Sequence, residues 1–162
     1  MPSVQLADVS LNYRFDGPES APVLVLSNSL GTDLHMWDAQ IPAFAEHFRV
    51  LRYDTRGHGG SDAPAGPYSM DRLGRDVVEL LDFLDIDRAH FLGLSLGGFI
   101  GQWLGVFAPN RIDRLILSNT APYLAAELHF DDQTHAVRAA SDMDAIADGF
   151  RSEEHTSELQ SH

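Results

Sequence analysis

Four short apolar segments, separated by stretches of helical character, constrain the fold of this chain more than any other feature. They occupy residues 23–26, 50–53, 91–94 and 115–118. A strand that is apolar throughout, instead of alternating with polar residues, is typical of a parallel sheet whose two faces are both covered. Because helical stretches lie between these segments, the sequence predicts the α/β class, with a mostly parallel sheet and helices on both faces.

The N-terminal residues follow a different pattern. Residues 4–6 and 10–15 alternate between apolar and polar side chains, and the second segment ends at Asp16-Gly17-Pro18. Alternation with a period of two, followed by turn residues, indicates an antiparallel hairpin, which we place at the edge of the sheet.

The clearest helix begins after Ser69, which is a favourable N-cap residue. One stripe of this helix is apolar and consists of Met70, Leu73, Val77, Leu80, Leu81 and Leu84. The charged side chains between these positions take the other face, which we expect to be exposed to solvent. Shorter helices are predicted over residues 39–47 and 136–147.

The composition excludes several classes of function. The chain has 162 residues, of which 44% are hydrophobic, so it can form a domain with a core. It has no cysteine, which excludes disulfides, thiolate metal sites and cysteine nucleophiles. All 11 cationic residues are arginine and the net charge is -13, so we expect no binding of nucleic acid or of anionic membranes. No segment approaches the roughly 18 apolar residues of a membrane span, and the first residues lack signal-peptide features, so a cytoplasmic location is expected.

The motif that says most about function lies between an apolar strand and an apolar helix. It is Gly-Leu-Ser-Leu-Gly at residues 93–97, and the helix is predicted over residues 99–107. In this setting G-x-S-x-G describes a sharp strand-to-helix turn that holds a serine on top of a sheet. The glycines allow the backbone to turn tightly and let the helix approach the sheet. Ser95 is therefore a candidate nucleophile; the alternative is a surface loop rich in Gly and Ser.

A second segment is expected to meet Ser95 at the same edge of the sheet. Residues 27–31, Ser-Asn-Ser-Leu-Gly, come directly after a strand, and α/β sheets bind ligands at the carboxyl ends of their strands. A serine hydrolase needs two backbone N–H donors for its oxyanion, one from the residue after the nucleophile and one from this loop. Leu96 and Leu30 fit these two positions. An ordinary turn at the end of the strand is the alternative for residues 28–29.

A third segment, residues 54–62, follows another predicted strand and is rich in glycine. Its Gly, Arg and Asp residues indicate a tight turn with internal hydrogen bonds more than a catalytic segment. His58 within this segment precedes Ser95, whereas the catalytic histidine of such a site follows the nucleophile in the chain. We therefore expect His58 to be structural.

The acid and base that a serine nucleophile needs are not evident in the chain. Asp113 follows Ser95 but lies before its strand, at the opposite end of the sheet. Four later candidates have no strand end to hold them, so we expect them at the solvated surface: His129, Asp131, Asp132 and His135.

Together these segments resemble the α/β-hydrolase fold and, more narrowly, the 3-oxoadipate enol-lactonases within it. The resemblance covers nearly all of residues 1–150 and is carried by residues 26–38, 51–64, 66–69 and 93–105. G-x-S-x-G specifies only the superfamily. Two features narrow the resemblance to the lactonase group: Asn-Ser-Leu-Gly at residues 28–31, in place of the usual His-Gly start, and Gly-Gln-Trp at residues 101–103.

The resemblance implies a serine hydrolase that opens the enol-lactone ring of 3-oxoadipate enol-lactone, in aromatic-compound catabolism, to give 3-oxoadipate. Ser95 would attack the lactone carbonyl and form an acyl-enzyme that water then hydrolyses. The backbone N–H groups of Leu30 and Leu96 would form the oxyanion hole. The resemblance implies a small-molecule lactone as the partner and neither cofactor nor metal, and it leaves the oligomeric state open.

The chain departs from that group in its C-terminal part. A complete member is expected to have roughly 250 residues, with a helical cap and later strands that carry the Asp and His of the triad. We therefore predict residues 1–120 as the N-terminal part of the hydrolase core, truncated before the last strands, and residues 121–150 as the start of the cap. Residues 151–162 resemble the in-frame translation of a sequencing adapter and are predicted to be non-native. On this interpretation the chain lacks the triad acid and base and is inactive by itself.

Other functions on the same fold are alternatives. An esterase or a carbon–carbon bond hydrolase would share the nucleophile and differ in substrate. A dehalogenase would carry an aspartate in place of Ser95. A non-catalytic ligand-binding protein would keep the pocket without turnover.

Overall fold

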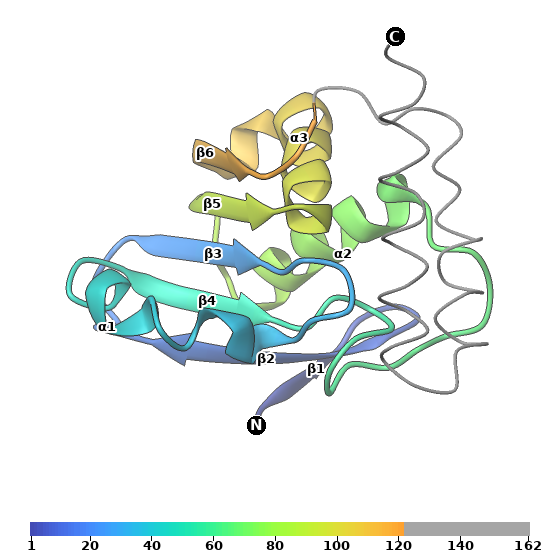
Figure 1. The fold of residues 1–162 in the computed structure, drawn as a ribbon, viewed down its shortest axis with the longest axis horizontal. Helices are drawn as coiled ribbons and strands as arrows, with labels where there is room; N and C mark the ends of the chain where they lie inside the picture. Colours follow the sequence, from blue (N-terminus) through green and yellow to red (C-terminus); the bar gives the residue numbers. More distant parts are fainter. Residues whose placement is uncertain (122–162) are drawn as a thin grey trace, which may run out of the picture. The chain divides into compact units, whose positions relative to one another are not determined.

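The computed structural model describes residues 1–121, which form a six-stranded sheet with helices packed on it (Figure 1). The strand order is β1-β2-β4-β3-β5-β6. The strands are β1 Ser3–Gln5, β2 Ser10–Asp16, β3 Val23–Ser27, β4 Arg49–Tyr53, β5 Ala89–Leu94 and β6 Ile112–Ser118. Strands β4, β3, β5 and β6 run parallel, so the predicted α/β class is confirmed.

The N-terminal strands form the antiparallel edge of this sheet. β1 pairs with β2, and Val4 lies opposite Leu11, both of them buried. β2 then pairs antiparallel with β4. The predicted edge hairpin is confirmed.

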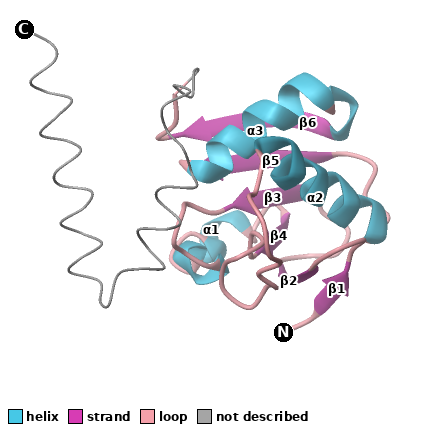
Figure 2. Cartoon of the chain, turned by 90° about the vertical axis from the view of Figure 1, so that its right-hand side faces the viewer, coloured by secondary structure: helices cyan, strands magenta, loops and turns pink. Residues whose placement is uncertain are grey.

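Five helical segments connect the strands within residues 1–121. They are the short 3-10 helices η1 Leu34–Trp37 and η2 Pro109–Arg111 and the α-helices α1 Ile41–Phe44, α2 Met70–Phe83 and α3 Leu96–Phe107. Helices α2 and α3 lie side by side on one face of the sheet, and α1 lies on the other (Figure 2). The sheet therefore has helices on both faces, as predicted.

The apolar strands bury side chains toward both helix layers. Leu24 and Leu26 of β3 form a cluster with Val50 and with Trp37 of η1. Val25 lies between them in sequence, points to the opposite face because successive strand residues alternate, and is fully buried. This burial on both faces explains why the strand is apolar throughout.

Helix α2 begins where the sequence predicts. The Ser69 hydroxyl accepts a hydrogen bond from the backbone N–H of Arg72 at 3.1 Å, so Ser69 is the N-cap. The buried apolar side chains of the helix include Leu73, Val77, Leu80 and Leu81. The expectation that the whole charged face is exposed is wrong at Asp76, which is only 2% exposed because it pairs with the buried Arg56.

The helix predicted over residues 39–47 is shorter in the structure. Helix α1 is a single turn with Pro42 near its start. Beyond it the N–H of Phe48 still donates to the carbonyl of Phe44 at 2.9 Å, but β4 already begins at Arg49. The helix ends early because the short connection has to return the chain to the sheet.

Strand β6 lies at the edge of the sheet formed by residues 1–121 and pairs there only with β5. Two of its apolar side chains are exposed, Ile116 at 51% and Leu117 at 40%. No helix in this part of the chain is long and apolar enough to span a membrane. Residues 122–162, which include most of the predicted cap segment and all of the adapter-like tail, lie outside the described residues.

Candidate active site

Ser95 lies at the sharp turn between β5 and α3. Its backbone has φ 53° and ψ -111°, a conformation that residues with a side chain rarely adopt. The Ser95 N–H donates to the carbonyl of Ser118 at 2.9 Å, and its own carbonyl accepts the N–H of Gly98 at 2.8 Å. Backbone strain of this kind costs about 1–3 kcal/mol and tends to occur at functional sites.

Three glycines around this serine are required by the close approach of neighbouring segments. A Cβ on Gly93 would lie 2.0 Å from the carbonyl oxygen of Gly97, and a Cβ on Gly97 would lie 2.1 Å from that of Ser27. A Cβ on Gly98 would lie 2.7 Å from Thr120. Real Cβ atoms essentially never come this close to other heavy atoms. The glycines therefore allow α3 to sit directly against the sheet, as the motif predicts.

The Ser95 side chain stands at the N-terminus of α3 without capping it. The residue is partly buried at the carboxyl edge of the sheet. The N-terminal end of a helix carries partial positive charge, so negative charge that develops beside this hydroxyl would be stabilised.

The two predicted oxyanion donors belong to segments that the structure brings together. Leu96 is the first residue of α3, where backbone N–H groups have no partner inside the helix, and Leu30 lies in the loop after β3. Within residues 1–121 neither N–H donates a hydrogen bond to another residue. The N–H of Gly97 donates to the carbonyl of Asn28 at 3.0 Å, so one hydrogen bond joins the loop of Leu30 to the turn of Leu96.

The loop that carries Leu30 is held by buried side chains. Asn28 is 1% exposed; its Nδ2 donates to the carbonyl of Tyr53 at 2.9 Å and its Oδ1 accepts from Trp37 Nε1 at 2.8 Å. The backbone N–H of Ser29 points to the sulfur of Met36 at 3.4 Å. Contacts from η1 and from the end of β4 therefore fix the path of the loop.

A hydroxyl pair lies at the carboxyl ends of the two neighbouring strands. The hydroxyls of Ser27 on β3 and Tyr53 on β4 are 2.8 Å apart, and both residues are buried. Burial raises the pKa of the Tyr53 hydroxyl, so Tyr53 stays neutral and acts as a hydrogen-bonding group of the scaffold.

The segment after β4 forms the internally bonded turn that the sequence predicts. The Asp54 carboxylate accepts hydrogen bonds from the N–H of Leu34 at 2.7 Å, from the N–H of Gly60 at 2.8 Å and from Asn12 Nδ2 at 2.8 Å. A Cβ on Gly59 would lie 2.3 Å from this carboxylate. Asp54 therefore ties three segments together and has a structural role.

A buried ion-pair network beside this turn is a feature that our sequence interpretation missed. Arg56 is 3% exposed in its side chain and contacts both carboxylate oxygens of Asp76, at 2.5 and 2.6 Å, and Asp8 at 2.9 Å. The hydrogen bonds to Asp76 raise the pKa of Arg56, and the hydrogen bond from Arg56 lowers the pKa of Asp8. The only signal in the sequence is an arginine three residues after the end of a buried strand, and it does not identify the partners.

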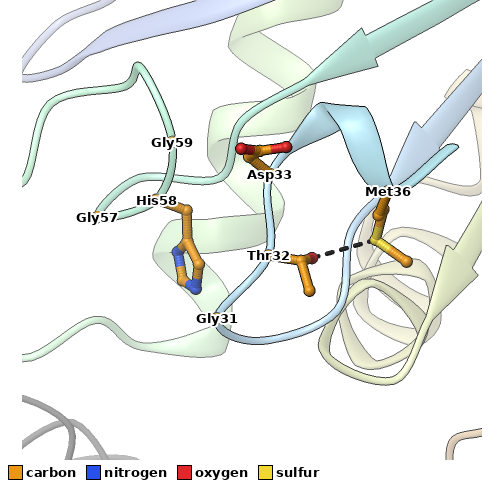
Figure 3. Close-up of a pocket in the computed structure, with 7 residues that line it drawn as sticks. All are labelled: Gly31, Thr32, Asp33, Met36, Gly57, His58 and Gly59. Carbon is orange, nitrogen blue, oxygen red and sulfur yellow. Dashed lines mark hydrogen bonds between the residues drawn. The ribbon is translucent and has the colours of Figure 1, made fainter. Parts of the chain in front are cut away.

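A pocket of about 430 Å³ opens beside the loop of Leu30 (Figure 3). It is lined by Gly31, Thr32, Asp33, Met36, Gly57, His58 and Gly59. The His58 ring points into the space between the two loops, and its Nδ1 lies 3.2 Å from the carbonyl oxygen of Arg56. Ser95 is not one of the lining residues, so this pocket lies beside the loop of Leu30 and does not contain the serine.

The remaining candidates from the sequence are not brought to Ser95. Asp113 is the second residue of β6, which starts earlier than predicted, and it pairs with Arg88 at 3.1 Å at the end of the strand away from Ser95. Within residues 1–121 no group of three or more His, Asp or Glu side chains is placed to hold a metal ion. The other candidates lie outside the described residues: His129, Asp131, Asp132 and His135.

Comparison with known proteins identifies relatives of this chain. A family model described as alpha/beta hydrolase fold matches residues 22–157. Among curated proteins, 3-oxoadipate enol-lactonase 2 of Acinetobacter baylyi is 47% identical over 131 residues, which are 81% of this chain and 49% of that protein. The chain thus spans about half the length of this relative.

Solved structures agree with this match. A hydrolase from Pseudomonas aeruginosa PA01 is 57% identical with a TM-score of 0.85, and the match covers 92% of this chain and 57% of that one. The enol-lactonase from Burkholderia xenovorans LB400 is 46% identical with a TM-score of 0.84, and the match covers 92% of this chain and 58% of that one.

Proposed function

Because the chain belongs to the α/β-hydrolase fold family, we propose that it carries the nucleophile and oxyanion donors of a serine hydrolase that converts 3-oxoadipate enol-lactone to 3-oxoadipate. The observation that carries this proposal is the strained turn of Ser95 at the N-terminus of α3, which a hydrogen bond from the Gly97 N–H to the Asn28 carbonyl joins to the loop of Leu30. Within residues 1–121 the N–H groups of Leu30 and Leu96 donate to no other residue. The choice of substrate is supported by the similarity to the Acinetobacter baylyi and Burkholderia xenovorans enol-lactonases.

The proposed reaction has two steps. The Ser95 hydroxyl oxygen attacks the lactone carbonyl carbon, the ring C–O bond breaks, and the enol oxygen leaves with a proton while the acyl group stays on the serine. Water then attacks the acyl-enzyme, releases the carboxylic acid and restores the serine. The freed enol tautomerises, its proton moving from oxygen to carbon, and so gives the ketone of 3-oxoadipate. In both steps the N–H groups of Leu30 and Leu96 stabilise the oxyanion, and one such donor is typically worth about 3 kcal/mol of barrier.

A base must take the serine proton, and we propose that it comes from outside the described residues. Within residues 1–121 no histidine forms a hydrogen bond with Ser95. In the proposed arrangement residues 1–120 are the nucleophile half of the core, residues 121–150 begin a cap, residues 151–162 are non-native, and an acid and a histidine follow on later strands.

The experiment begins with the source DNA, read across the Phe150 codon, and with expression of the complete reading frame. We expect the frame to diverge from the present sequence after Phe150 and to encode an Asp and later a His, each after an apolar strand. The protein from that frame should hydrolyse the enol-lactone, and Ser95→Ala should lower the rate by about 10⁴- to 10⁶-fold. The chain of residues 1–162 should be indistinguishable from its own Ser95→Ala variant.

Three outcomes would contradict the proposal in different ways. Turnover by residues 1–162 above the Ser95→Ala control would place a base within this chain, with His58 as the first candidate. Preference for an aryl ester or for a carbon–carbon bond substrate would keep the hydrolase and replace the substrate. A genomic frame that reproduces residues 151–162 and then stops, with no turnover, would favour a ligand-binding role.

A further inference from the structure

Asn28 lies directly after β3, at the start of the loop of Leu30, which we call the oxyanion loop (residues 28–31). Both polar groups of its side chain and its backbone carbonyl form hydrogen bonds. Its Nδ2 donates to the carbonyl of Tyr53, its Oδ1 accepts from Trp37 Nε1, and its backbone carbonyl accepts from the N–H of Gly97. The residue is 1% exposed, so solvent cannot replace these hydrogen bonds. A side chain that is bonded at both ends and buried has one available orientation.

The partners of Asn28 come from three different elements. Tyr53 ends β4, Trp37 ends η1 and Gly97 lies in the first turn of α3. Asn28 is therefore the point where the sheet, the short helix on one face and the nucleophile helix on the other face are joined.

Short helix η1, which carries the partner Trp37, is itself held by hydrogen bonds to buried side chains. The Leu34 N–H at the start of η1 donates to the Asp54 carboxylate at 2.7 Å, and the Leu34 carbonyl accepts from Arg52 at 3.1 Å. Arg52 and Asp54 are both buried at the end of β4. These two hydrogen bonds hold η1 in place, and η1 in turn positions the Trp37 indole N–H that donates to Asn28 Oδ1.

The chemistry at this position requires an amide. The carbonyl of Tyr53 needs a donor and the indole of Trp37 needs an acceptor, and both are served by one short planar group. A carboxylate supplies only acceptors, and an aliphatic side chain supplies neither. A buried polar group that loses its partner is costly, so the loop would shift to find one.

We propose that Asn28 is a positioning residue that sets the distance between the two oxyanion donors. Leu30 lies two residues after Asn28. Leu96 directly precedes Gly97, and the N–H of Gly97 donates a hydrogen bond to the Asn28 carbonyl. A shift of Asn28 would therefore move one donor relative to the other without touching Ser95. This inference rests on the proposed function.

The test uses the protein expressed from its complete reading frame and the Asn28→Asp variant. This variant keeps the size of the side chain and the acceptor for Trp37 and removes the donor to Tyr53. We expect kcat for the enol-lactone to fall about 10- to 100-fold and KM to change by less than about twofold, because the donors act mainly in the transition state. Trp37→Phe removes the indole donor together with part of a ring that packs in the core cluster with Leu24 and Leu26, and it should lower kcat in the same direction.

Val77→Ala is the matched control for lost stability. Val77 is fully buried on α2 and has no part in the oxyanion loop. This variant should unfold at lower urea concentration and keep the wild-type kcat. Equal kcat in folded Asn28→Asp and wild type, a change confined to KM, or an equal loss of kcat in Val77→Ala would overturn the inference.

A second readout needs no substrate. Hydrogen exchange at the Gly97 amide should be about tenfold faster in Asn28→Asp than in the wild type and unchanged in Val77→Ala, because only the first variant loosens the Asn28 carbonyl. Unchanged exchange in Asn28→Asp would overturn the inference. Absence of turnover in the wild type would contradict the proposed function, and the exchange comparison would still decide whether Asn28 fixes the loop.

Discussion

At the scale of single residues, Ser95 combines a positive φ with a side chain, a combination that costs free energy and tends to occur at functional sites. Glycine would adopt φ 53° and ψ -111° at lower cost, since it has no Cβ to clash with the backbone. The strain is maintained by the hydrogen bonds of the turn, in particular from Ser95 N–H to Ser118. The turn therefore holds the Ser95 hydroxyl in one position at a cost in stability.

We therefore expect Ser95→Gly to raise the free energy of unfolding. The gain should be about 1 kcal/mol, because relief of strain exceeds the extra entropy that glycine gives the unfolded chain. Ser95→Ala is the control, since it removes the hydroxyl and keeps the strain. Urea unfolding of both variants at low protein concentration measures the difference, and equal stability of the two would contradict the strain argument.

The glycines of α3 differ in what surrounds them, and substitution should distinguish them. A Cβ on Gly97 would meet the backbone of Ser27 at 2.1 Å, whereas a Cβ on Gly105 would meet only the end of the Leu115 side chain at 3.2 Å. We expect Gly97→Ala to cost about 3 kcal/mol, because the backbone has to move. Gly105→Ala should be neutral or slightly stabilising, because alanine favours helix by up to about 1 kcal/mol. Similar losses in thermal unfolding for both would argue against close approach as the role of Gly97.

At the scale of elements, Arg56 links the turn after β4 to α2 and to the β1–β2 connection. It contacts Asp76 on α2 and Asp8 between the two strands. The sequence pattern predicted that Asp76 is exposed, because it lies on the charged face of the helix. The pattern shows which residues share a face and does not show what packs against that face. Its burial depends on an arginine 20 residues away in the chain.

This linkage predicts a specific loss of stability in acid. The hydrogen bond from Arg56 lowers the pKa of Asp8 below its usual 3.8. A lowered folded-state pKa contributes stability that is fully present above the unfolded value and is lost as the pH falls through the folded value. We expect the free energy of unfolding of the wild type to fall below about pH 4. The free energy of unfolding of Asp8→Asn should fall less steeply over the same range. Parallel curves for the two proteins between pH 5 and pH 2.5 would contradict the assignment.

At the scale of the whole molecule, β6 is an apolar edge in the described part of the chain. Exposed apolar edge strands pair with other chains, so we expect residues 1–162 to self-associate with increasing concentration. Ile116→Lys should reduce this association, because Ile116 is 51% exposed on β6. Phe83→Lys makes the same chemical change at an exposed position on α2 and is the control. Sedimentation velocity measures the effect, and a monodisperse wild-type monomer would refute the prediction.

The apolar strands, the edge hairpin, the Ser69 cap and the Ser95 turn could all be predicted from the sequence, because each depends on neighbours within one element or one turn. The order of the strands in the sheet was not predicted. Local periodicity and glycine spacing record such constraints directly. Helix α1 was predicted too long, and the burial of Asp76 and the three partners of Asn28 were not predicted. These features depend on contacts between residues far apart in the chain, such as Asn28 with Tyr53 and with Gly97, and only folding of the sheet brings those residues to within 3 Å of each other.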